Sequence, residues 1–224
     1  MRYLLKEIAK LWKKMLLSSP DLNILSNNLF IADCMDAKLS QVNVKSLTEN
    51  VFKLLEDDWM LFTAGNRDSF NMMAASWGAL GVLWNQPIAI GFIRPQRYTF
   101  EFADKSDLFT LSFFPEKHRP ALNYCGSHSG RTVDKVAGSG LTPAYTERGS
   151  VYFTEARLVL ECRKIYSDDI KADHFFKTSL IKEIYPKNDF HRFFIGEIVS
   201  CLSSSATIKG IPPDLSGDTG GEIS

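Results

Sequence analysis

Two arginines are the residues whose type and spacing best suit chemistry. Arg94 and Arg97 lie at the start of residues 98–105, which are predicted to form a short helix, and Tyr98 and Thr99 follow directly. The first backbone N–H groups of a helix carry partial positive charge, and a guanidinium can hold two phosphate oxygens. The segment therefore predicts an anion site, although two ordinary surface arginines would show the same spacing.

A run of small and apolar residues precedes these arginines. Residues 71–78 read Asn-Met-Met-Ala-Ala-Ser-Trp-Gly, and the run 70–77 is predicted to form a strand. Trp77, Trp84, Phe113 and Phe114 offer a flat apolar surface for an aromatic ring, or they fill a core. From the pattern alone, a turn with core packing explains the run better than a binding site does.

Several common sites are excluded by their missing motifs. The chain has neither a Gly-x-Gly-x-x-Gly run after a strand nor a Walker phosphate loop. Residues 126–130 resemble a nucleophile elbow, but His128 takes the position of the serine. Cys125 and His128 have the spacing of metal ligands, yet no second pair completes a tetrahedral site. We expect no metal.

Two further candidates flank predicted elements. His191 precedes a predicted strand, where it either contacts a cofactor or nicotinamide or lies on the surface. Asp134 and Lys135 follow the polar loop 125–131, where they either contact a cofactor or form a solvated helix face.

The elements that must position these residues are mostly strands. Hydrophobic patterning predicts strands at 59–64, 70–77, 87–93, 108–114, 155–166 and 190–202, and helical segments at 98–105, 116–124, 132–137 and within 171–184. The order of these elements is that of a barrel.

The two ends of the chain differ from this central part. Residues 1–17 have an amphipathic helical pattern, which suits a packed helix, a basic membrane-surface or targeting segment, or an extension upstream of a start at Met35. We expect residues 1–37 to be a dispensable extension. Residues 203–224 lack a core-forming pattern, so a disordered tail is predicted.

Composition restricts the class of protein. A chain of 224 residues that is 45% hydrophobic can bury one substantial core. Twenty-six basic residues balance twenty-six acidic ones, which argues against nucleic-acid binding. Four widely spaced cysteines suggest reduced thiols, and no apolar run reaches the roughly 18 residues of a membrane span. We expect a cytoplasmic protein that does not enter the membrane.

Five blocks in one order resemble the FMN-binding split-barrel family of flavin reductase-like proteins, and the flavoredoxin-like branch most closely. The blocks are residues 71–78, 94–99, 109–114, 129–135 and 190–197. The resemblance covers about residues 38–202 and leaves both ends outside.

The resemblance implies a mainly β fold, a Greek-key split β-barrel with several short α-helices. It implies a homodimer that holds FMN non-covalently near the subunit interface. The residues it places around the cofactor are Asn71, Met72, Met73, Ala74, Ala75, Ser76, Trp77, Arg94, Arg97, Tyr98, Thr99, Ser112, Phe113, Phe114, Ser129, Arg131 and Lys135, with His191 near the incoming nicotinamide. Relatives usually carry Thr where this chain has Ala74, so one hydroxyl is missing.

The activity implied is that of an NAD(P)H-dependent flavin oxidoreductase. A hydride would pass from the nicotinamide to flavin N5, and electrons would leave to free flavin, an acceptor protein or a small acceptor. Because FMN performs the redox chemistry, no indispensable catalytic acid, base or nucleophile is expected. A flavoredoxin-type electron carrier and a non-redox ligand-binding barrel are the alternatives.

Overall fold

The computed structural model describes residues 39–204. The chain divides into two units, Met1–Ala37 and Lys38–Ser224, and the described residues all belong to the second. The predictions for residues 1–37 and for residues 205–224 lie outside the described residues.

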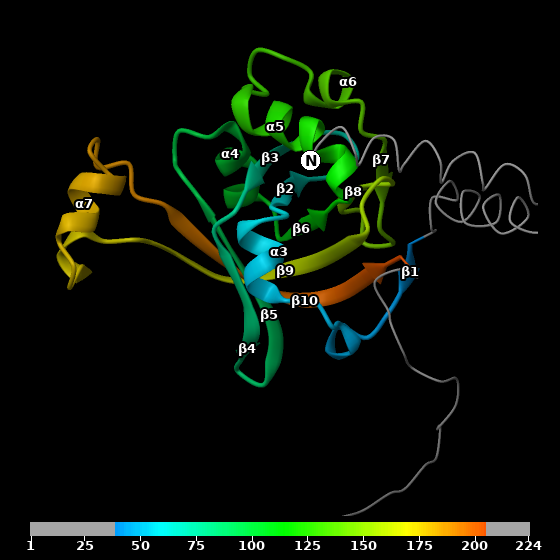
Figure 1. The fold of residues 1–224 in the computed structure, drawn as a ribbon, viewed down its shortest axis with the longest axis horizontal. Helices are drawn as coiled ribbons and strands as arrows, with labels where there is room; N and C mark the ends of the chain where they lie inside the picture. The colour runs from blue at the N-terminus through cyan, green and yellow to red at the C-terminus, as the bar shows by residue number, and fades with distance from the viewer. Residues whose placement is uncertain (1–38, 205–224) are drawn as a thin grey trace, which may run out of the picture. The chain divides into compact units, whose positions relative to one another are not determined.

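The described residues form an antiparallel sheet of eight strands (Figure 1). Its order is β3-β2-β6-β9-β10-β5-β4, and β1 also pairs with β10. The bounds are β1 Ser40–Gln41, β2 Met60–Gly65, β3 Phe70–Ala75, β4 Gly78–Leu83, β5 Gln86–Ile93, β6 Leu108–Phe113, β9 Leu158–Asp169 and β10 Arg192–Ser203. A separate hairpin joins β7 Pro143–Tyr145 to β8 Val151–Phe153.

Short helices connect these strands. The α-helices are α3 Val51–Glu56, α4 Tyr98–Lys105, α5 Arg119–Ser127, α6 Lys135–Ser139 and α7 Ser179–Ile184, and the 3-10 helices are η1 Val44–Ser46, η2 Glu116–His118 and η3 Ala172–His174. None of the helices within residues 39–204 is long and apolar enough to cross a membrane.

The long strand β10 exchanges neighbours along its length. Its first half pairs with β5, while Leu202 and Ser203 pair with β1. Two register shifts interrupt its pairing with β9, and such irregularities bend a strand and increase its twist. The predicted tail from residue 203 therefore starts too early. Ser203 ends this strand and is fully buried, and Ser204 is buried and donates its N–H to the Arg157 carbonyl oxygen.

Stacked phenylalanines fill the barrel between the strands. The rings of Phe62 and Phe109 stack with centroids 4.7 Å apart, and both are buried. A Cβ on Gly91 would come within 2.6 Å of the Phe62 ring, and one on Gly196 within 2.7 Å of the Phe109 ring. The two glycines thus make room in β5 and β10 for the stack.

Most element predictions hold, and the differences have local causes. Helix α4 occupies the predicted residues 98–105. Helix α5 extends to Ser127, and α6 begins only at Lys135 because the Asp134 carboxylate caps it, accepting from two backbone N–H groups. The glycine-rich strand β4 is missed, since residues such as Gly81 have low strand propensity. It pairs with β5 across a turn in which both residues have positive φ angles.

Candidate functional site

Two adjoining cavities lie beside the start of α4. The first has a volume of about 460 Å³ and is lined by Met73, Arg94, Gln96, Arg97, Tyr98, Thr99, Ser127, His128, Ser129, Gly130 and Lys135. The second, of about 210 Å³, is lined by Met73, Ala74, Ala75, Ser76, Trp77, Phe92, Arg94, Arg97 and His191. Met73, Arg94 and Arg97 line both, so the two cavities form one site.

The N-terminus of α4 opens into the first cavity. Arg97 is the N-cap residue, but its side chain does not cap the helix. Phe100 N–H bonds back to the Arg97 carbonyl oxygen, whereas the N–H groups of Tyr98 and Thr99 have no hydrogen-bond partner among residues 39–204. The hydroxyl of Thr99 accepts from Asn71 Nδ2 at 2.9 Å, so its own proton is available to a ligand.

Three cationic side chains surround this helix start, but their charges are engaged differently. Arg94 forms an ion pair with Asp189 and donates to the Ile184 carbonyl oxygen at 2.9 Å. Arg97 donates one bond, of 3.0 Å, to the Gly126 carbonyl oxygen, and no carboxylate within residues 39–204 pairs with it. Arg97 is therefore the cation most available to an anionic ligand.

Lys135 is buried, and its side chain links two elements of the fold. Its Nζ donates to the Met72 carbonyl oxygen at 2.8 Å and to the Cys125 carbonyl oxygen at 2.7 Å, which ties β3 to α5. Burial lowers the pKa of the Lys135 ammonium, while Cys125 raises it. Two of its three N–H donors are thus used on backbone, and the side chain positions the strand that lines the site.

Gly130 lets the polar loop approach β3 closely. A Cβ at this position would lie 2.1 Å from Asn71 Oδ1, the other end of the amide that binds Thr99. The loop, β3 and α4 therefore meet at a point where only glycine fits.

The second cavity has an aromatic edge. The rings of Trp77 and His191 lie 4.9 Å apart, and His191 Nδ1 is 2.9 Å from the Tyr185 hydroxyl. Burial is the main cause that lowers the pKa of His191 to about 4, with Arg94 acting in the same direction. The imidazole is therefore neutral near neutral pH.

The structure brings together most of the predicted site residues. Those that line the two cavities are Met73, Ala74, Ala75, Ser76, Trp77, Arg94, Arg97, Tyr98, Thr99, Ser129, Lys135 and His191. Asn71 and Met72 line a neighbouring cavity instead, although Asn71 reaches the site through Thr99. Arg131 is paired with Glu101, and its guanidinium lies 4.7 Å from the centroid of the Tyr98 ring.

Three predicted residues do not reach the site. Ser112, Phe113 and Phe114 line neither cavity, because β6 is an interior strand between β2 and β9. Phe113 packs into one core cluster and Phe114 into the other. The alternative reading of these aromatic residues, as barrel filling, is the one the structure supports.

Sequence reasoning missed five lining residues: Phe92, Gln96, Ser127, His128 and Gly130. Gln96 lies between the two arginines, and the last three share the 126–130 loop with Ser129. Their proximity to predicted residues was the available signal. Phe92 carried no such signal, since it reads as an ordinary strand residue.

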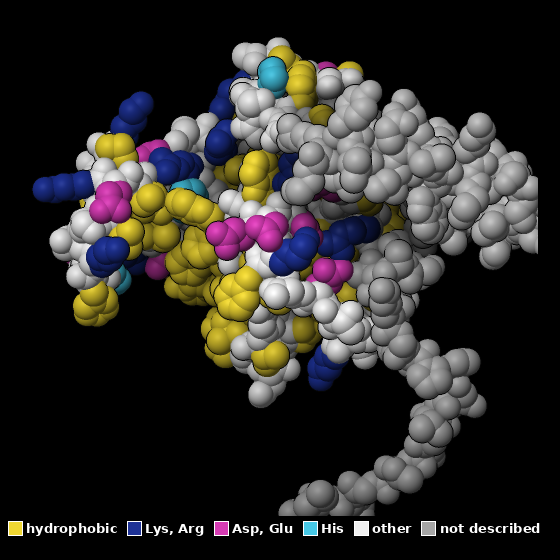
Figure 2. All heavy atoms as spheres, in the orientation of Figure 1, with side chains coloured by type: hydrophobic (Ala, Val, Ile, Leu, Met, Phe, Trp, Pro, Cys, Tyr) yellow, Lys and Arg dark blue, Asp and Glu magenta, His cyan; other side chains and the backbone are white. Residues whose placement is uncertain are grey.

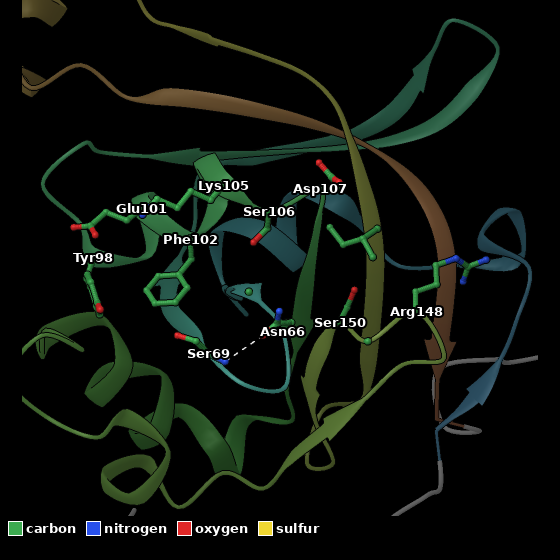
Figure 3. A pocket seen from close by; sticks show the side chains of 13 residues that line it. Asn66, Ser69, Tyr98, Glu101, Phe102, Lys105, Ser106, Asp107, Arg148 and Ser150 are labelled. Carbon is green, nitrogen blue, oxygen red and sulfur yellow. Dashed lines mark hydrogen bonds between the residues drawn. The ribbon is translucent and has the colours of Figure 1, made fainter.

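A larger cavity, of about 600 Å³, runs along α4 from Tyr98 to the C-terminal end of the helix (Figure 3). Figure 3 shows Ser106 from the helix end above Asn66 and Ser69, with Ser150 beside Asn66, while the side chain of Lys105 runs toward Glu101. Of the predicted site residues, only Tyr98 lines it. The volume of a cavity therefore does not identify the candidate site. The site is identified by the cationic side chains that meet beside the N-terminus of α4.

The fold and the site define a β-barrel with a cavity whose cationic and aromatic lining suits a small molecule with an anionic end. The chain belongs to the flavin reductase like domain family, whose model matches residues 56–209. This confirms the family resemblance and, with it, the predicted mainly β split-barrel fold. A comparison with curated proteins finds no match.

Solved structures of the same fold are similar over most of their length. A flavoredoxin from Methanosarcina acetivorans is 26% identical with a TM-score of 0.51, and the match covers 66% of this chain and 69% of that chain. The flavoredoxin of Desulfovibrio vulgaris (Miyazaki F) is 23% identical with a TM-score of 0.52, covering 75% and 77%. The FMN-binding domain of a flavin reductases-like enzyme from Shewanella baltica OS155 is 16% identical with a TM-score of 0.56, covering 76% and 80%.

The residues present fit FMN. Its phosphate would meet the Arg97 guanidinium, which has no carboxylate partner among residues 39–204, and the N-terminus of α4, which no side chain caps. Its planar ring would find the small side chains of Ala74, Ala75 and Ser76 with the aromatic edge of Trp77 in the second. The cationic lining of the first cavity adjoins the small and aromatic lining of the second, which matches a molecule with a planar ring at one end and a phosphate at the other.

Proposed function

We propose that the protein is an NAD(P)H-dependent flavin oxidoreductase that binds FMN in the two joined cavities. The observation that carries the proposal is a single site that combines two features: an arginine at a helix N-terminus with no carboxylate partner among residues 39–204, and a wall of small residues with an aromatic edge. Family membership supports the same conclusion.

Bound FMN would supply the redox chemistry, taking a hydride from NAD(P)H at N5. The chain's own part is to bind and orient. Arg97 and the first N–H groups of α4 would hold the phosphate, and the backbone of β3 would supply hydrogen bonds to the flavin. Ala74 contributes no hydroxyl there, which lowers affinity by about 0.5–1.5 kcal/mol relative to a chain with a hydrogen-bonding Thr. His191 offers a neutral imidazole for contact with the nicotinamide.

A flavoredoxin-type electron carrier is the second candidate. The match to the Methanosarcina acetivorans flavoredoxin supports it, and so does Trp77, which is 46% exposed at the cavity edge where an acceptor protein could approach. A carrier would hold FMN but would not turn over NAD(P)H.

We further propose that the protein is a homodimer. Val82 and Trp84 are 75% and 59% exposed on the β4–β5 hairpin, and Figure 2 shows hydrophobic side chains gathered there. A second copy that covered these side chains would remove their apolar surface from water.

Steady-state oxidation of NADH and NADPH with added FMN separates the two candidates. An oxidoreductase consumes nicotinamide catalytically and with saturation, whereas a carrier binds FMN with negligible turnover. Arg97→Ala is the matched control, because it should raise the FMN concentration needed for turnover without changing the fold. Sedimentation velocity tests the dimer, and a purely monomeric protein at micromolar concentration would refute it.

A further inference from the structure

A long connection between β9 and β10 reaches back to the candidate site. It contains η3 and α7, and in Figure 1 it extends away from the barrel. Its rings cluster, with the Tyr185 centroid 4.7 Å from that of Phe190 and 6.1 Å from that of Phe175. The guanidinium of Arg94 lies 5.3 Å from the Tyr185 ring centroid and holds the Ile184 carbonyl oxygen. Tyr185 is thus fixed in place and only 4% exposed.

The hydroxyl of Tyr185 determines which nitrogen of His191 carries the proton. The hydroxyl oxygen lies 2.9 Å from Nδ1, which is its only hydrogen-bond partner among residues 39–204. Because Nδ1 is the only acceptor within reach of this buried hydroxyl in the described part of the chain, the hydroxyl proton is satisfied only by donation to Nδ1. If Nδ1 were the donor, a buried hydroxyl proton would be left without an acceptor among residues 39–204, which is costly. Nδ1 is therefore the acceptor.

The other ring nitrogen of His191, Nε2, belongs to a ring that lines the second cavity. Nε2 has no hydrogen-bond partner in the described part of the chain, and it is not among the fully enclosed atoms that lack one. The imidazole ring lines the cavity and packs against the Trp77 ring, with an angle of 47° between the two ring planes. A neutral imidazole that accepts at Nδ1 must carry its single proton at Nε2.

We propose that Tyr185 is a positioning residue that holds His191 as the Nε2–H tautomer, so that a neutral N–H donor faces the cavity. The acceptor that this donor suits is a carbonyl oxygen on a planar heterocycle. Both the pyrimidine edge of a flavin and the carboxamide of a nicotinamide have one. This inference rests on the proposed function for the identity of the occupant, but the tautomer is a property of the chain alone.

Imidazole nitrogen correlation spectra of the ¹⁵N-labelled, FMN-free protein test the tautomer directly. His191→Gln assigns the His191 signals by their disappearance. The wild type should show Nε2–H, and Tyr185→Phe, which keeps the ring but removes the hydroxyl, should change the tautomer ratio about fivefold toward Nδ1–H. Tyr166→Phe, a change on β9 outside both cavities, should change nothing. An Nδ1–H wild type, or an unchanged ratio in Tyr185→Phe, would overturn the proposal.

Binding measurements on Tyr185→Phe identify the occupant. A several-fold weaker FMN affinity with unchanged KM for NAD(P)H assigns the donor to the flavin, and the reverse pattern assigns it to the nicotinamide. If both values match those of the wild type, the donor meets neither ring and the proposal fails. If the wild type takes up no FMN, the proposed function fails, while the wild-type spectrum still decides the tautomer without any variant.

Discussion

Replacing Arg97 with Ala should weaken FMN binding far more than replacing Arg131 with Ala. Both arginines are exposed, so they are matched in solvent access. Arg131 is already paired with Glu101, whereas Arg97 donates a single bond to a backbone carbonyl and has no carboxylate partner among residues 39–204. Only Arg97 retains charge and N–H donors for the phosphate.

The magnitude follows from the bonds that are lost. A hydrogen bond to a charged group contributes about 1.5–3 kcal/mol, and exposure favours the lower value. We therefore expect Arg97→Ala to raise the Kd for FMN about tenfold, and Arg131→Ala to raise it less than about threefold.

Quenching of flavin fluorescence on titration with protein provides the assay. Riboflavin, which lacks the phosphate, supplies the second half of a thermodynamic cycle. Arg97→Ala should leave riboflavin affinity unchanged, because the lost interaction is with the phosphate. Equal losses for the two arginines, or an equal loss for FMN and riboflavin, would refute the assignment of the phosphate to the start of α4.

Four further predictions concern stability and the ends of the chain. Lys135→Met should lower the free energy of unfolding by about 1–3 kcal/mol in urea titrations, since two buried backbone carbonyls lose their donor; an unchanged midpoint would contradict the bracing role. Gly130→Ala should weaken FMN binding and lower the melting temperature, because the new Cβ collides with Asn71; a wild-type Kd would show that the loop can yield. Burial lowers the pKa of His191 from 6.5 to about 4, so the unfolded chain takes up the proton at a higher pH than the folded chain does. The free energy of unfolding should therefore fall, by at most about 3 kcal/mol, as the pH drops from 6.5 to 4, and His191 should contribute little pH dependence above 6.5. His191→Gln should flatten that part of the stability–pH profile. Deleting residues 1–34 should leave FMN affinity unchanged, and a large loss would place that segment in the fold.

Regular patterns were predictable from the sequence, and contacts between distant segments were not. Helix α4 could be placed to the residue because its apolar spacing and the preceding Pro95 define its start. The β9 and β10 strands were found by their β-branched and aromatic content, yet the exchange of β10 from β5 to β1 depends on register shifts that leave no simple pattern.

The site shows the same division. The sequence predicted two arginines at the start of α4, but spacing could not reveal that Asp189, 95 residues away, engages Arg94, while Arg97 has no carboxylate partner among residues 39–204. Lys135 was predicted to contact the cofactor, whereas its Nζ mainly braces β3 and α5. Aromatic type alone also could not distinguish Trp77 at the cavity edge from Phe113 in the core.

The most direct test of the central claim, that the joined cavities at the start of α4 hold FMN, is the visible absorbance spectrum of the purified protein after incubation with FMN and removal of the free flavin. Our account predicts stoichiometric retention of flavin by the wild type and much reduced retention by Arg97→Ala. A wild-type protein that remains colourless, or an Arg97→Ala variant that retains as much flavin as the wild type, would contradict it.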